Sequence, residues 1–84
     1  MQALASPVRL RILSLLRTGP RTVTELSERL DLAQTTLSNH LRLLRHITLV
    51  TGHRVGRHIH YALFDDHVAD LLDEAIGHLR HTHR

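Results

Sequence analysis

The chain has 84 residues, of which 42% are hydrophobic and 2% aromatic, with nine histidines, no cysteine and a formal net charge of +3 when the histidines are neutral. This length supports one domain with a small core that buries about 60–65% of the unfolded surface, so a second subunit would add stability. The lack of cysteine excludes disulfides, cysteine-ligated metal centres and thiol catalysis. No run approaches the roughly 18 apolar residues of a membrane span and no basic-then-apolar leader opens the chain, so we expect a cytoplasmic protein without a membrane partner.

The charge is unevenly distributed along the chain. Residues 1–64 contain nine arginines and three acidic side chains, a net charge of +6, whereas residues 65–84 contain two arginines and five acidic side chains, a net charge of −3. A basic body indicates a polyanionic partner, and an acidic segment that also contains histidines indicates a cationic one.

The first clear helix is predicted to begin after Ser6, with Pro7 at its first position, and to end before the pair Gly19-Pro20. Its apolar side chains recur at helical spacing, at Val8, Ile12, Leu13, Leu15 and Leu16. We expect this helix to turn one apolar face toward the core.

A short helix, a tight turn and a longer helix follow. Thr22 and Glu25 are spaced as a capping box for the short helix, although Thr24 competes as its N-cap. Asp31 lies in the turn, where aspartate tolerates a left-handed conformation. The longer helix covers residues 34–46 and has a polar face opposite an apolar stripe of Leu37, Leu41 and Leu44. This arrangement is a helix-turn-helix, over about residues 24–46.

After the helix-turn-helix the hydrophobic period changes to two. Residues 50–55 and 58–64 are predicted strands around the two-residue loop Gly56-Arg57. One face of the second strand is apolar, with Ile59, Tyr61 and Leu63. A basic hairpin after a helix-turn-helix is a wing, here over residues 50–64.

The last segment, residues 65–81, is predicted to be a helix with an uninterrupted apolar stripe of Val68, Leu71, Leu72, Ala75, Ile76 and Leu79. The pattern as a whole predicts an α+β, mainly helical fold. We expect residues 1–84 to form a single winged helix-turn-helix domain, with residues 65–81 as a helix for metal binding and dimerisation.

The basic residues collect on the two elements that a winged helix presents to DNA. Arg42, Arg45, Arg54 and Arg57 can neutralise phosphates, and Gln34, Thr35, Ser38 and Asn39 can reach base edges. We therefore predict double-stranded DNA as a partner. The alternative is that these arginines form only a solvated face and that the helix-turn-helix is a packing motif.

Three histidines of the last helix, His67, His78 and His81, lie on one ridge beside the apolar stripe. Because His67 and His78 are ~16 Å apart along the axis, one helix cannot bring them to one metal ion. Two antiparallel helices with a two-fold axis near Asp73 would place Asp65 and His67 against the partner's His78 and His81, with the apolar stripe as the seam.

One carboxylate and three imidazoles suit Zn(II), or Co(II) or Ni(II) with added ligands. Asp66 is an alternative to Asp65 as the carboxylate, and His83 is a further candidate ligand. A solvated histidine-rich tail is the alternative to a metal site. The remaining histidines are scattered across faces and are interpreted as surface or DNA-proximal residues: His40, His46, His53, His58 and His60.

The chain resembles the ArsR/SmtB family of winged-helix, metal-sensing repressors. Three motifs carry the resemblance: residues 3–13 (ALASPVRLRIL), residues 32–41 (LAQTTLSNHL) and the signature Asp-x-His-x10-His-x2-His at positions 65, 67, 78 and 81. The signature is similar to that of the zinc- and cobalt-sensing branch and favours Asp65 over Asp66. The resemblance also implies DNA contacts from Gln34, Thr35, Ser38 and Asn39, and wing contacts from Arg54 and Arg57.

The chain departs from the family pattern at three places. Ala33 replaces the usual serine, which removes the N-cap of the DNA-reading helix, and Asn39 replaces a frequent histidine. The family normally has a further helix before Ala3, so either the dimer is built mainly on the final helix or this chain is a shortened version.

The function that follows from these patterns is that of a regulator and not an enzyme, because no nucleophile motif or phosphate loop is present. We expect a homodimeric repressor that binds an inverted-repeat operator when metal-free and is released by Zn(II), controlling metal efflux or resistance genes. The alternatives are a Ni(II)/Co(II) sensor of the same family and a histidine-rich metal-buffering protein that does not read DNA.

Overall fold

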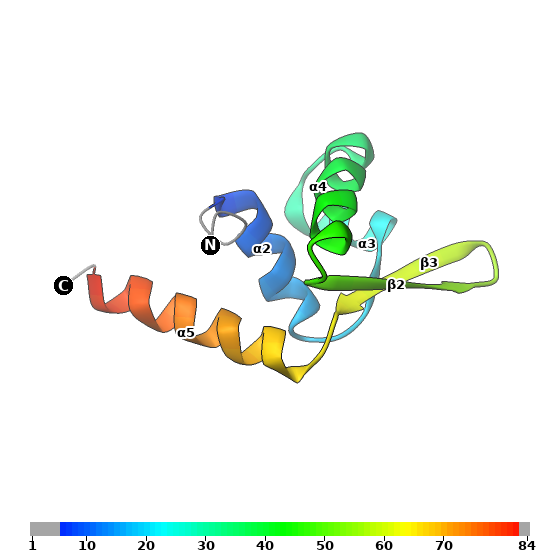
Figure 1. Cartoon of the computed structure of the whole chain (residues 1–84). Coiled ribbons are helices and arrows are strands. Elements are labelled where there is room, and N and C mark those ends of the chain that lie inside the picture. The colour runs from blue at the N-terminus through cyan, green and yellow to red at the C-terminus, as the bar shows by residue number, and fades with distance from the viewer. Residues whose placement is uncertain (1–5, 83–84) are drawn as a thin grey trace.

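The computed structural model describes residues 6–82, and their side chains as far as Gly77. The elements in chain order are α2 (Pro7–Leu16), β1 (Arg21–Thr22), α3 (Val23–Leu30), α4 (Gln34–His46), β2 (Val50–Val55), β3 (His58–Leu63) and α5 (Asp66–Thr82). The β2–β3 hairpin projects at one end of the molecule, and α5 extends toward the opposite end (Figure 1). The predicted mainly helical winged helix-turn-helix is confirmed.

The helix boundaries agree with the capping signals. The Ser6 side chain accepts a hydrogen bond from the Arg9 backbone N–H, and α2 begins at Pro7. Thr22, and not Thr24, caps α3: its Oγ1 accepts from the Glu25 N–H at 3.2 Å, while Glu25 Oε1 accepts from the Thr22 N–H at 3.0 Å. The hydrogen bond from the Thr22 backbone also lowers the pKa of Glu25.

Three expected boundaries, the end of the second strand and both ends of the last helix (Asp66–Thr82 instead of residues 65–81), are off by one residue, and one strand is missing from the prediction. β3 ends at Leu63 instead of residue 64, and α5 begins at Asp66 because the Asp65 side chain caps it, accepting from the Val68 N–H at 3.2 Å. The missed strand is β1, which pairs antiparallel with β3 and gives the sheet order β1-β3-β2. Two residues are too few to show an alternating pattern.

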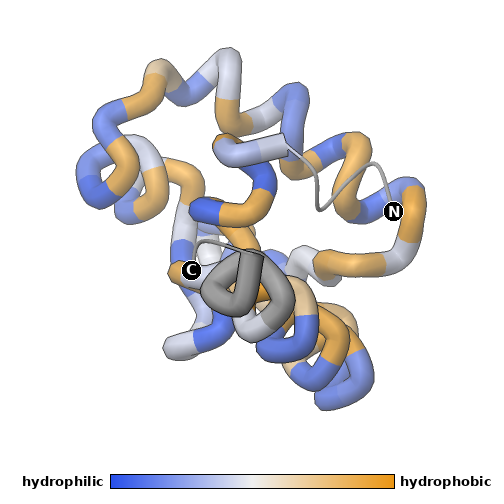
Figure 2. Tube along the Cα trace, turned by 90° about the vertical axis from the view of Figure 1, so that its left-hand side faces the viewer, coloured by the Kyte–Doolittle hydropathy of each residue, from blue (hydrophilic) through white to orange (hydrophobic). Residues whose placement is uncertain are grey.

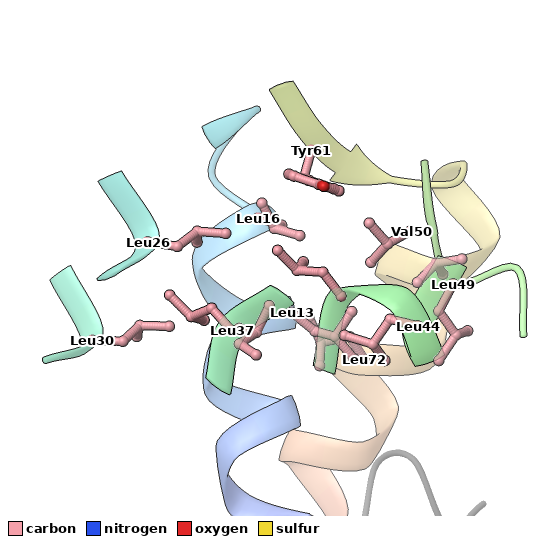
Figure 3. Close-up of a cluster of buried hydrophobic side chains, with 13 residues drawn as sticks. Leu13, Leu16, Leu26, Leu30, Leu37, Leu44, Leu49, Val50, Tyr61 and Leu72 are labelled. Carbon is pink, nitrogen blue, oxygen red and sulfur yellow. The ribbon is translucent and has the colours of Figure 1, made fainter. Parts of the chain in front are cut away.

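The core is aliphatic and draws on every long element (Figure 3). Its buried members are Ile12, Leu13, Leu16, Leu26, Leu30, Leu37, Leu41, Leu44, Leu49, Val50, Tyr61, Val68 and Leu72. Tyr61 lies at the margin of this cluster, on β3, and is the one aromatic side chain in it (Figure 3). The core therefore holds α4 and the hairpin on the same scaffold.

The apolar stripe of α5 is divided between two directions. Val68 and Leu72 are 7% and 1% exposed and belong to the chain's own core, and Ile76 packs against that core. The prediction that the whole stripe forms a seam between two copies is therefore wrong for Val68 and Leu72, because their side chains are already buried within one chain, where α5 packs against α2 and β3. Leu71 and Ala75 lie on the flank of α5 and are only partly buried.

Hydrophobic and hydrophilic positions are interspersed along the coloured parts of the helices (Figure 2). Within the described residues, none of the helices has both the length and the apolar character needed to cross a membrane.

Candidate nucleic-acid interface and metal-binding helix

The helix α4 exposes one polar face because its opposite face is buried. Leu37, Leu41 and Leu44 are at most 1% exposed. The predicted DNA-reading residues on this helix are all exposed: Gln34, Thr35, Ser38, Asn39 and Arg42. The helix begins at Gln34, and Ala33 at the N-cap position provides no side-chain cap, as the sequence predicts, so the first backbone N–H groups of α4 have no side-chain acceptor.

The wing is a regular antiparallel hairpin with Gly56, at φ +64°, in its loop. The two predicted contact residues of the wing, Arg54 and Arg57, are exposed. His53 lies directly opposite His60. Since side chains alternate along a strand, His53, His58 and His60 share the outer face of the hairpin, away from the core. The interpretation that the histidines are scattered across faces is therefore wrong for these three.

The arginines fall into two classes. Four of them contact their own chain: Arg9 Nε donates to His40 Nδ1 at 3.4 Å, Arg11 donates to the Leu30 carbonyl at 3.1 Å, and Arg17 and Arg21 bind acidic side chains. By contrast, the side chains of five exposed arginines make no hydrogen bond or ion pair with a described residue. Arg29 lies on α3, and the other four lie on α4 and the hairpin: Arg42, Arg45, Arg54 and Arg57. Four of these five unpaired arginines thus lie where DNA is predicted to bind.

An open depression of about 460 Å³ lies between α4 and the sheet. It is lined by Ser38, Arg42, Arg45 and His46 of α4 and by Tyr61 of β3. The sequence reasoning missed it as a site, because a depression between a helix and a strand far apart in the sequence leaves no linear signal. The sequence indicates only its basic side chains on α4, Arg42 and Arg45, and not their combination with Tyr61.

Arg17 connects α2 to α5. Its Nε and Nη2 donate to the two carboxylate oxygens of Asp73 at 3.3 and 3.1 Å. This hydrogen-bonded pairing lowers the pKa of Asp73 and raises that of Arg17. The negative charges of Asp70 and Asp66 add smaller effects that also raise the pKa of Arg17.

Two of the four predicted metal ligands lie together at the start of α5. Asp65 Oδ1 caps the helix, and Asp65 Oδ2 lies 3.5 Å from His67 Nδ1. The His67 side chain is 95% exposed, so it is open to a second molecule. Asp66, the alternative carboxylate, is also exposed and lines an open depression together with Arg17 and Asp65.

The other predicted ligands are on a continuous helix. The backbone of α5 runs unbroken from Asp66 to Thr82, so His67 and His78 are ~16 Å apart along its axis. The side chains of His78 and His81, and the whole of His83, lie outside the described residues. Among the side chains that are described, no three histidine, aspartate or glutamate residues are grouped so as to hold a metal ion.

Comparison with known proteins identifies the family. Residues 4–53 match a family model described as a helix-turn-helix domain. The chain is 54% identical over 83 residues to the HTH-type transcriptional regulator NmtR of Mycobacterium tuberculosis, covering 99% of this chain and 69% of NmtR. It is 41% identical over 78 residues to the HTH-type transcriptional repressor SmtB of the same species, covering 93% of this chain and 58% of SmtB. The chain belongs to the ArsR/SmtB family of winged-helix, metal-sensing repressors.

Solved structures agree with this membership. The solution structure of apo-NmtR matches with a TM-score of 0.80 at 55% identity, covering 95% of this chain and 67% of that one. The homodimeric winged helix-turn-helix DNA-binding domain of Mb0332 from Mycobacterium bovis matches with a TM-score of 0.89 at 32% identity. The match covers 94% of this chain and 73% of the Mb0332 chain. The chain is accordingly a helix-turn-helix transcriptional regulator and not an enzyme.

Proposed function

We propose that this ArsR/SmtB family member is a homodimer that binds double-stranded operator DNA when metal-free and releases it when Zn(II) binds between the two subunits. The observation that carries the DNA-binding part is the group of exposed, unpaired arginines on α4 and the hairpin. The pairing of Asp65 with the fully solvated His67 supports the metal-binding part.

In the DNA complex, α4 would enter the major groove and the hairpin would contact the minor groove or backbone. Gln34, Thr35, Ser38 and Asn39 would face the DNA from α4, while Arg42, Arg54 and Arg57 would bind phosphates. A two-fold symmetric dimer reads an inverted repeat, one half-site per subunit.

The open flank of α5 is the proposed dimer contact. Leu71 and Ala75 are partly exposed there, on the side of the helix that carries His67. Two antiparallel copies of α5 would bury this flank. They would also bring Asp65 and His67 of each subunit to the partner's His78 and His81.

This donor set of one carboxylate and three imidazoles fits a tetrahedral Zn(II), and Co(II) or Ni(II) are alternatives with added ligands. A bound ion would link the two subunits in one relative arrangement. If that arrangement spaces the two α4 helices wrongly for the operator, metal and DNA oppose each other with a reciprocal coupling of ~1–3 kcal/mol. In the cytoplasm such a repressor would control metal efflux or resistance genes.

The test begins with an operator selected from a pool of random duplexes. Its affinity is then measured with a chelator and with Zn(II) at one ionic strength. We expect weaker binding with Zn(II), and equal or tighter binding would contradict the proposal. A protein that only buffers metal would show no steep dependence of duplex binding on salt.

The visible spectrum of the Co(II) form separates the metals. Intense tetrahedral bands would support the four-ligand site. Weak octahedral bands would favour a Ni(II)/Co(II) sensor that recruits His83 or other groups.

A further inference from the structure

We propose that the depression between α4 and the sheet binds a phosphate of the DNA backbone, so that Ser38 holds the backbone, beside Arg42 and Arg45, instead of reading bases. This inference rests on the proposed function, because it concerns how the chain binds DNA. It adds His46 and Tyr61 to the interface.

The charge of the depression suits an anion. Two of the five residues that line it are arginines, a third is a histidine, and none is acidic. Arg42 and Arg45 are both exposed and neither pairs with a described side chain. Guanidinium groups bind phosphate oxygens with paired hydrogen bonds, and the Ser38 hydroxyl adds a donor.

The depression begins on one flank of α4, at Ser38 and Arg45, and this position points these two side chains to the backbone. At ~100° per residue, Ser38 and Arg45 stand ~75–95° from the buried leucine stripe, whereas Arg42 stands ~135° from it, and His46 stands ~150–170° from it, as Thr35 and Asn39 do. A helix about 10–12 Å wide fills a major groove about 12 Å wide. The side opposite the core therefore meets base edges, and the flanks meet the phosphates that wall the groove.

A second depression continues the same flank toward the hairpin. It has a volume of about 250 Å³ and includes Gln34 of α4, Arg57 and His58 of the hairpin, and again Tyr61. Because Tyr61 borders both depressions, a single backbone strand can follow this flank from the wing to Arg45. Base reading then depends chiefly on Thr35 and Asn39.

The wall formed by Tyr61 is held in place by close packing. Gly52 lies opposite Tyr61 in the hairpin, and a Cβ at this glycine would lie 3.3 Å from Tyr61 Cε1 and 3.1 Å from Ile59 Cγ2. The bare backbone of Gly52 thus lets the ring lie against β2. The depression is a preformed part of the fold.

The test compares Arg45→Gln, Ser38→Ala and Asn39→Ala, with Arg29→Gln as a control at an exposed arginine on α3, outside both depressions. For each variant, affinities for the selected operator and for an unrelated duplex are measured between 50 and 200 mM salt, on protein shown to be folded by circular dichroism. Loss of a backbone contact lowers the affinity for both duplexes by the same factor, whereas loss of a base contact changes the ratio of the affinity for the operator to that for the unrelated duplex.

We expect Arg45→Gln to reduce the slope of log affinity against log salt by about 0.9, with the operator-to-unrelated ratio unchanged. Ser38→Ala should also preserve this ratio, Asn39→Ala should lower it, and Arg29→Gln should change neither quantity. An unchanged slope in Arg45→Gln, or a ratio that falls in Ser38→Ala as in Asn39→Ala, would overturn the inference and leave the proposed function standing. Failure of the unaltered chain to bind any duplex would overturn both.

Discussion

Arg17 and Arg57 carry the same charge but have opposite surroundings. Arg17 donates two hydrogen bonds to Asp73 and so ties α2 to α5, whereas Arg57 stands exposed at the wing tip and pairs with no described residue. The comparison distinguishes arginines that stabilise the fold from arginines whose charge is available to a polyanion. The following predictions test this separation and the corresponding one between the core side and the open side of α5.

The largest expected effect is on the open side of α5. His67→Ala should abolish release of operator DNA by Zn(II) while metal-free DNA binding stays nearly intact, because His67 is fully solvated and contributes nothing to the core. The measurement is operator affinity with a chelator and with Zn(II). Glu74→Ala, an exposed acidic position on the same helix, is the control and should keep the response. Loss of metal-free binding in His67→Ala would instead indicate a structural role.

A second contrast compares two adjacent leucines of α5. Leu72→Ala should destabilise the chain by about 2–5 kcal/mol, since the side chain is 1% exposed in the core and its truncation leaves a cavity. Leu71→Ala should cost less stability but weaken the dimer. Urea denaturation and sedimentation equilibrium measure the two effects. If Leu72→Ala does not fold, Leu72→Val provides the smaller change; equal effects of both leucines on dimerisation would contradict the division of the stripe.

A charge-matched pair tests the two classes of arginine directly. Arg57→Gln should reduce the salt slope of DNA binding by about 0.9 and leave the denaturation midpoint unchanged. Arg17→Gln should lower the midpoint and leave the slope unchanged, because its partner is Asp73. A reversed result would show that the wing arginine supports the fold.

The smallest expected effect is a dependence of stability on pH at the α2–α5 contact. Arg17 lowers the pKa of Asp73, so this pairing stabilises the fold above the ordinary aspartate pKa of about 3.9 and is lost as the pH falls through the lower, folded-state pKa. Asp73→Asn should therefore lower the free energy of unfolding at pH 7. The free energies of unfolding at pH 7 and pH 3 should then differ by less than in the unaltered chain. An identical difference in both proteins would show that the pair contributes nothing to acid sensitivity.

The agreement between prediction and structure is closest where the signal is local. Ser6, Thr22 and the leucines of α4 specify their helices through caps and periodicity, which depend on neighbours a few residues away. The exposure of Thr35 and Asn39 followed from the same periodicity. β1 and the depression beside Tyr61 could not be predicted, because each is formed by segments about 15 to 40 residues apart in the sequence.

The sequence by itself determined the fold class, the positions of α4 and the wing, and the spacing of Asp65 and His67, because caps, hydrophobic period and motif spacing are properties of short stretches. Only the tertiary structure decided which arginines are committed to the fold, which side of α5 is buried, and that three wing histidines share one face. Those outcomes depend on packing between distant elements and on strand register. The arginines that give the chain its net charge of +3 therefore act in two ways: some form hydrogen bonds and ion pairs within the fold, and others form an exposed basic surface for DNA.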